Sequence, residues 1–302
     1  MKAAVIGIGS NSVRCLLAET GEDGFTCLWR DREGTRLFAG LDERGNLSRE
    51  SMDKTVAAVA RMASEVRHQR AEKLGVFATS AARDAANGEE FIRAVAEAAE
   101  TEPQILPGNE EAELSFLGAS AAVKDERCGV VDIGGGSTEF AIGTREGIEA
   151  SFSCQMGAVR LYQKLRIDRK EDMIPVQRAA GEILKEHLGA FDGIEIPKTW
   201  VGTGGTFTTL AAMARGVSWT DRTNMHGTEI ARWEIQEIGE KLAEMSLEER
   251  KQLPGLQPGR ADIVVHGICI LLAVMKHLGT ETITVSEYGN LDGYLRKRYF
   301  SC

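Results

Sequence analysis

Apolar residues in this chain gather in short runs rich in valine, isoleucine, leucine and alanine, and glycine-led turns close several of them. Runs of about four to eight such residues between turn signals are typical of buried β-strands. We expect strands over residues 3–8, 13–18, 25–30, 75–80, 103–106, 128–133, 138–142, 199–203 and 282–286.

Other apolar positions recur every three or four residues, which is the spacing of an amphipathic helix. In the segment 52–74, Val59 and Ala63 would share one face, and Ser48 or Ser51 can cap the helix start. We expect further helices over residues 89–100, 110–123, 175–190, 204–214, 261–278 and 291–299, and a loop over 247–259. This alternation of strands and helices predicts an α/β fold.

The chain also contains an internal repeat. Residues 6–13 can be set over residues 131–138 at a constant offset of 125, and each copy is an apolar strand, a glycine-led turn with a serine, and a second apolar strand. Two later strand ends with a threonine, Thr79 and Thr203, stand at an offset of 124. We therefore expect two duplicated α/β domains that face each other across a cleft. The charged run after residue 123 would divide them into 1–124 and 125–302, and the last helix can pack back on the first domain.

The turns of the repeat suit a phosphate. Glycine lets backbone N–H groups approach an anion, and serine adds a hydroxyl donor. The predicted phosphate-binding residues of the turns are Gly9, Ser10, Asn11, Ser12, Gly134, Gly135, Gly136, Ser137, Gly204, Gly205 and Thr206. A dinucleotide fingerprint from Gly7 onward is not supported, because that motif must open a helix and a strand is expected here.

Composition narrows the possible ligands. The 302 residues carry a formal net charge of −9, which argues against broad nucleic-acid or membrane binding but leaves room for a local anion site. The longest apolar stretch, 263–275, is too short to span a bilayer and is interrupted by His266. We expect a cytoplasmic protein with no nucleic-acid or membrane partner.

Several motifs resemble the exopolyphosphatase / guanosine pentaphosphate phosphatase (Ppx/GppA) family over nearly the whole chain. The most specific is Asp132-Ile133-Gly134-Gly135-Gly136-Ser137-Thr138-Glu139, and the others lie at 9–14, 78–83, 108–112, 202–206 and 260–262. The resemblance implies two actin-like (sugar kinase/heat-shock chaperone/actin), ribonuclease H-like domains in a short form without an extra C-terminal helical domain.

The same resemblance implies hydrolysis of a terminal phosphoanhydride of inorganic polyphosphate or of pppGpp, usually with Mg²⁺, by a homodimer. Glu111 aligns with the family's catalytic glutamate, which would act as general base on the attacking water. Asp132 and Glu139 would hold Mg²⁺, and Arg83 would neutralise phosphate charge. From the residues alone, the pattern favours a solvated acid at a helix start for Glu111, and Asp132 could cap the glycine turn. The basic stretch 160–170 could guide a polyanion or form a solvated helix face.

Three positions depart from the family pattern. Gly7 stands where an aspartate is usual, Leu291 where an arginine is usual, and His266 where a proline is usual. The first two remove one carboxylate and one cation from the expected site. His266 could be a substitute base or a satisfied polar residue at a helix start. A catalytically weakened sensor of polyphosphate or an alarmone is therefore an alternative to the hydrolase, and an ATP-dependent kinase is a further one.

Overall fold

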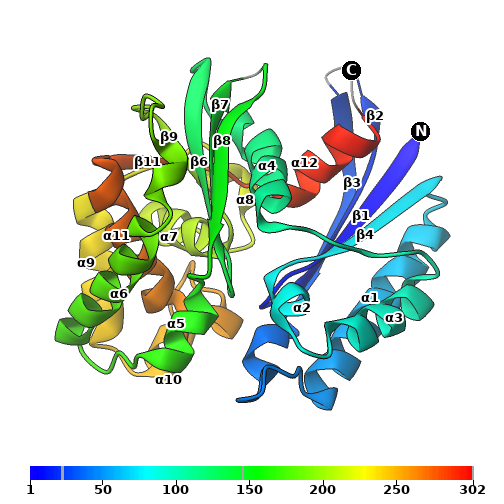
Figure 1. Cartoon of the computed structure of the whole chain (residues 1–302), viewed down its shortest axis with the longest axis horizontal. Coiled ribbons are helices and arrows are strands. Elements are labelled where there is room, and N and C mark those ends of the chain that lie inside the picture. The colour runs from blue at the N-terminus through cyan, green and yellow to red at the C-terminus, as the bar shows by residue number, and fades with distance from the viewer. Residues whose placement is uncertain (22–23, 145, 301–302) are drawn as a thin grey trace. The chain divides into compact units, whose positions relative to one another are not determined.

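The computed structural model describes residues 1–21, 24–144 and 146–300, and the chain forms two units (Figure 1). The first unit combines Met1–Gly118 with the C-terminal segment that begins at Asn290, and the second is Ala119–Gly289. The chain therefore passes from one unit to the other twice, after Gly118 and after Gly289. The sequence suggested a boundary after residue 124 and a last helix that can pack back on the first domain.

The sheet of the first unit has the order β3-β2-β1-β4-β5. The strand β1 pairs antiparallel with β2 and parallel with β4, and β3 and β5 form the two edges. The bounds are β1 (Lys2–Ile8), β2 (Val13–Gly21), β3 (Gly24–Glu33), β4 (Lys73–Ala78) and β5 (Gln104–Ile105). The hairpin of β1 and β2 is the strand-turn-strand unit that the first copy of the repeat predicted.

The long helix α1 (Arg49–His68) packs on β1 and β2, and α3 (Gly88–Ala99) packs against α1. Ser48 caps α1, because its side chain accepts a hydrogen bond from the Ser51 N–H. The helix ends at His68, earlier than the predicted residue 74, because the chain turns through Arg70 with a φ of 57° and then enters β4. The remaining α-helices of this unit are α2 (Ser80–Asp84), α4 (Gly108–Ala119, whose last residue falls in the second unit) and α12 (Asn290–Arg298).

The sheet of the second unit repeats this plan. Its order is β10-β11-β9-β6-β7-β8, and β6 again pairs antiparallel with the next strand, β7, and parallel with β9. The bounds are β6 (Arg127–Ile133), β7 (Thr138–Thr144), β8 (Ile148–Cys154), β9 (Trp200–Thr203), β10 (Glu229–Ala231) and β11 (Thr282–Val285). Only the short antiparallel edge strand β10 has no counterpart in the first sheet. The predicted fold class, two duplicated α/β domains, is confirmed.

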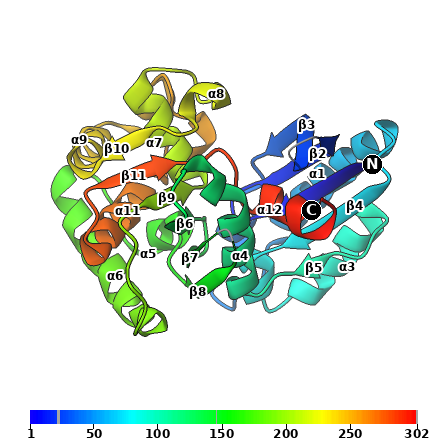
Figure 2. The same cartoon turned by 90° about the horizontal axis from the view of Figure 1, so that it is seen from above.

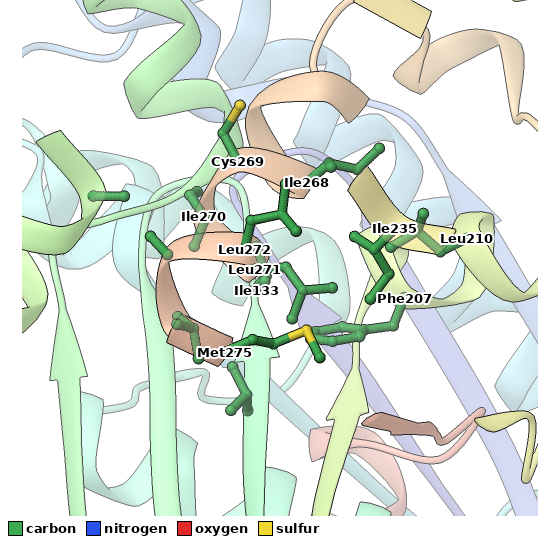
Figure 3. Close-up of a cluster of buried hydrophobic side chains, with 14 of the residues drawn as sticks. Ile133, Phe207, Leu210, Ile235, Ile268, Cys269, Ile270, Leu271, Leu272 and Met275 are labelled. Atoms are coloured by element: carbon green, nitrogen blue, oxygen red, sulfur yellow. The ribbon is translucent and has the colours of Figure 1, made fainter. Parts of the chain in front are cut away.

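The core of the second unit is built around α11 (Val264–Leu278), whose first twelve residues are all buried (Figure 3). It packs against α6 (Met173–Lys185), α9 (Arg232–Ala243) and α5 (Ala158–Lys164). Figure 3 shows Phe207 and Leu210 of α7 (Gly205–Arg215) in the same cluster. A helix that is apolar on all sides must be buried in this way, and the sequence predicted it.

Several elements of the second unit differ from the prediction. The loop expected over 247–259 contains α10 (Leu247–Lys251), which Ser246 and Glu249 start with reciprocal side-chain-to-backbone hydrogen bonds. The elements β8, β10, α5, α8 (Arg222–Met225) and α9 were not predicted. Short 3-10 turns lie at Leu37–Gly40, Ser120–Ala122, Lys170–Asp172, Leu188–Phe191 and Pro258–Arg260. Within the described residues, no helix is both long and apolar enough to cross a membrane.

Candidate active site

The two glycine turns have the same backbone hydrogen bond at the predicted offset. In the first, the Gly9 N–H donates to the Ser12 carbonyl over 3.0 Å, and in the second the Gly134 N–H donates to the Ser137 carbonyl over 3.0 Å. The strand ladders agree, since Ile8 pairs with Val13 at the first turn and the corresponding residues pair at the second. The repeat at an offset of 125 is therefore confirmed as two equivalent hairpins.

In the first turn, the carbonyl groups are held by the segment that precedes α1. The Ser10 carbonyl accepts from the Phe38 N–H over 2.8 Å, and the Asn11 carbonyl accepts from the Arg36 N–H over 3.1 Å. Neither the Ser10 nor the Asn11 N–H donates to a protein acceptor in the described part of the chain. The buried Asn11 Oδ1 also has no partner there. A turn with its carbonyls tied and its N–H groups available is suited to an anion.

In the second turn, the carbonyl groups are held by N–H groups at the start of α5. The Gly134 carbonyl accepts from the Ala158 N–H over 3.0 Å, and the Gly135 carbonyl accepts from the N–H groups of the two residues that follow. Arg160 adds a side-chain contact, because its Nε donates to the Gly136 carbonyl over 2.7 Å. Among the described residues, the N–H groups of Gly135 and Gly136 have no protein acceptor. The sequence analysis placed Arg160 in the basic stretch 160–170 and did not predict its contact with this turn.

A third turn joins β9 to α7. Gly204 has a φ of 96°, a conformation that favours glycine, and a Cβ on Gly205 would lie 1.8 Å from Cζ of Arg260. The Arg260 guanidinium therefore lies directly on this turn, although the sequence only placed it in a family motif. Thr206 is buried at the start of α7.

The offset of 124 predicted for the second repeat is wrong. The helix after β4 begins at Ser80 and the helix after β9 begins at Gly205, which is an offset of 125. The strand ladders set Phe77 opposite Gly7 and Thr203 opposite Asp132, which is an offset of 126, so Thr79 and Thr203 are not equivalent positions.

A row of polar side chains crosses the second sheet next to the triple-glycine turn. Asp132 on β6 pairs with Thr203 on one side and with Glu139 on the other, and Glu139 pairs with Ser153. Directly opposite residues project from the same face of a sheet. Asp132 is 7% exposed and Glu139 is 1% exposed, and the Ser153 hydroxyl donates to Glu139 Oε1 over 2.8 Å.

This row fits a magnesium ion in part. Within the described residues there is no group of three or more His, Cys, Asp or Glu side chains that could hold a metal. Mg²⁺, however, keeps several water ligands and is usually bound through one or two carboxylates together with substrate phosphates. Asp132 and Glu139 supply that number of carboxylates.

The corresponding row of the first sheet has a different composition. Gly7 pairs with Phe77 on β4 and with Arg14 on β2. A Cβ on Gly7 would lie 2.9 Å from Cζ of Phe77 and 3.0 Å from Cδ1 of Leu291. The two family departures, Gly7 and Leu291, are therefore neighbours, and an aspartate at position 7 would require the Phe77 and Leu291 side chains to shift.

Glu111, the predicted catalytic acid, lies in the first turn of α4 and is 6% exposed, so it is not a solvated surface acid. Arg83 on α2 donates from Nη1 to Glu111 Oε2 over 3.4 Å and to the Leu106 carbonyl over 2.8 Å. The buried Nη2 of Arg83 has no partner in the described part of the chain. Arg83 and Glu111 are thus brought together within the first unit, and Arg83 keeps a donor for a ligand.

His266 does not join the glycine turns. It is 2% exposed, and its Nε2 donates to the Leu165 carbonyl over 2.8 Å, since a carbonyl can only accept. Burial lowers the pKa of His266, and the nearby Arg250 cation lowers it further. The ring lies edge-on to Tyr162 and lines a separate cavity of 270 Å³ in the second unit. These contacts match a buried polar residue at a helix start.

The repeated strand order and the paired glycine turns define a duplicated α/β protein of the actin-like class. The sequence model of the Ppx/GppA phosphatase family matches residues 16–298, and the chain belongs to this family. It is 32% identical to "Exopolyphosphatase 2" of Mycobacterium tuberculosis, over 97% of each chain.

Solved structures agree with this assignment. The chain is similar to an exopolyphosphatase from Cytophaga hutchinsonii, with a TM-score of 0.88 and 26% identity over 98% of this chain and 97% of the other. It is also similar to the Aquifex aeolicus PPX-GPPA enzyme, with a TM-score of 0.82 and 26% identity over 99% of each chain.

Proposed function

We propose that this chain is a hydrolase that releases the terminal phosphate of inorganic polyphosphate or of pppGpp. The observation that carries the proposal is the buried Glu111 carboxylate, held by Arg83 in a unit that also presents a turn with available N–H groups. Membership of a phosphatase family whose relatives include an exopolyphosphatase supports the same reaction class.

Each residue would have a defined role. The N–H groups of both glycine turns would bind phosphate oxygens, and the free donor of Arg83 would compensate the charge that develops on the departing phosphoryl group. Glu111 would accept a proton from the attacking water and orient it, which general bases do in phosphoryl transfer. Asp132 and Glu139 would hold Mg²⁺, which when bound neutralises negative charge on the phosphates.

The test is phosphate release from polyphosphate, pppGpp and ATP, with and without Mg²⁺, by the wild type and by Glu111→Gln. We expect Mg²⁺-dependent release from polyphosphate or pppGpp and loss of release in the variant. Glu97→Gln, an exposed acid on α3, is the matched control and should behave as the wild type. Release that does not depend on Glu111 would contradict the proposal, and release from ATP alone would indicate the kinase class.

A second candidate is a sensor that binds the same phosphate compounds without hydrolysing them. The contact of Phe77 and Leu291 at Gly7 favours it, because an apolar group fills the place where the family usually has a carboxylate. Calorimetric titration with polyphosphate distinguishes the two. The sensor predicts tight binding by both wild type and Glu111→Gln with turnover by neither, whereas the hydrolase predicts turnover by the wild type.

A further inference from the structure

The last helix, α12, crosses α4, the helix that carries Glu111, at very short range. A Cβ on Gly293 of α12 would lie 1.9 Å from the Leu114 carbonyl oxygen of α4. That atom belongs to the backbone, so any side chain at position 293 would push the two helices apart. Figures 1 and 2 show α12 beside α4 in both views.

Two ion pairs join the same helices on either side of Glu111. Lys297 Nζ lies 2.7 Å from Glu113 Oε2, and Arg298 Nη2 lies 3.1 Å from Glu110 Oε1. The side chains of these pairs are between a quarter and two-fifths exposed. Exposed pairs of this kind add little to folding stability, but these two connect the end of α12 to the first turns of α4.

The opposite side of α12 is fixed to the sheet of the first unit. Asp292 is buried and pairs with Arg30 on β3, and Asn290 accepts a hydrogen bond from Arg14 Nη2 over 3.0 Å. The Tyr294 ring stacks on Phe77 with 5.4 Å between the ring centroids. The helix α12 is therefore held by the sheet of the first unit as well as by α4.

We propose that α12 is the element that positions Glu111, with Gly293, Lys297 and Arg298 as positioning residues. The proposal rests on the proposed function, in which Glu111 orients the attacking water. A general base must stay within hydrogen-bond reach of that water, and a displacement of about 1 Å can cost about 100-fold in rate. The chain passes between the two units at the end of α4 and at the start of α12, so both connections leave from this helix pair.

The main experiment is the kinetics of Gly293→Ala. We expect kcat to fall by about 10- to 100-fold with KM within about twofold of the wild-type value, because substrate is still bound but Glu111 is displaced. Gly34→Ala is the matched control, since a Cβ at Gly34 meets no atom within 4 Å, and it should change neither constant.

Substitutions in the ion pairs test the same positioning role and should have a smaller effect on kcat. Lys297→Gln should lower kcat about two- to fivefold, and Lys297→Arg should restore it because the pair with Glu113 can form again. Arg49→Gln breaks a surface pair with Asp53 on α1 and should leave kcat unchanged. A purely structural role for Lys297 would change the unfolding temperature without this change in kcat.

A crystal structure of Gly293→Ala separates this inference from the proposed function, because it needs no activity. We expect α4 to shift and the 3.4 Å distance between Arg83 Nη1 and Glu111 Oε2 to lengthen. An unchanged distance together with an unchanged kcat would overturn the positioning role. If the wild type releases no phosphate, the proposed hydrolase function is contradicted. The distance between Arg83 Nη1 and Glu111 Oε2 in the variant would still test whether α12 positions Glu111.

Discussion

The two sheets share one backbone plan but carry opposite chemistry at the same place. Beside the turn of the second unit, the row of paired residues contains Asp132 and Glu139. Beside the turn of the first unit, the corresponding positions hold Gly7 and Arg14, and Phe77 and Leu291 fill the space above the glycine. In the described part of the chain, the duplicated fold therefore has two equivalent glycine turns, with paired carboxylates in the strand row beside the second.

This difference shows which features are preserved in two duplicated domains. The backbone hydrogen bond that closes each turn is the same in both units, because it depends on backbone positions and on glycine. The neighbouring side chains are free to diverge, since a residue on the face of a strand can change without altering the ladder. The carboxylates proposed to hold a metal thus lie in the second unit, and Glu111, the proposed catalytic acid, lies in the first.

The largest effect is expected when the carboxylate of the second unit is removed. Asp132→Asn should lower phosphate release by about 100-fold or more and raise the Mg²⁺ concentration needed for half-maximal rate. A phosphate-release assay over a Mg²⁺ series measures both. Asp192→Asn, an exposed acid of the same unit, is the control. An unchanged Mg²⁺ dependence in Asp132→Asn would show that the proposed metal ion is not held by this row of residues.

The reciprocal change places a carboxylate in the first unit. Gly7→Asp should lower the free energy of unfolding by about 1–3 kcal/mol, because the new Cβ would lie 2.9 Å from a Phe77 ring that is itself stacked on Tyr294. Urea denaturation measures the loss. Gly34→Asp, at an open position, should cost much less. Equal stability of the Gly7 variant and the wild type would show that the apolar contact is not tight.

A smaller effect, on KM, is expected from a difference in the hydrogen-bond donors that hold the carbonyl groups of the two turns. The Asn11 carbonyl is tied by a backbone N–H, but the Gly136 carbonyl is tied by the Arg160 side chain. Arg160→Gln removes the charge-assisted hydrogen bonds to the Gly136 carbonyl and to Gln155, and should raise KM by about tenfold as the turn loosens. A rise in KM with little change in kcat supports this role, and unchanged kinetics would argue that α5 alone holds the turn.

The smallest effect concerns acid stability of the second unit, which contains the buried His266. Its folded-state pKa is below the ordinary value, so the unfolded chain binds the proton first as pH falls, and stability should decrease below about pH 6.5. The His266→Gln variant keeps a donor for the Leu165 carbonyl but does not titrate in this range. It should therefore show a weaker loss of urea midpoint between pH 7 and 5. An identical loss in both proteins would assign the effect to other groups.

The sequence predicted the parts of the fold that local patterns determine. The two hairpins follow from apolar runs around glycine turns, and α11 follows from an apolar run too long for a strand. The sequence analysis did not predict β8 or α9, most of whose residues are only partly buried. It also missed Arg160 and Arg260 as neighbours of the turns, since only tertiary packing brings a distant arginine onto a glycine.

The most direct test of the central claim is single-turnover phosphate release from bound polyphosphate by the wild type and Glu111→Gln, with affinity measured on the same samples. We expect the two proteins to bind polyphosphate with equal affinity and the variant to release phosphate about 10²- to 10⁴-fold more slowly, which is the usual contribution of a general base. Equal rates in the two proteins would contradict it.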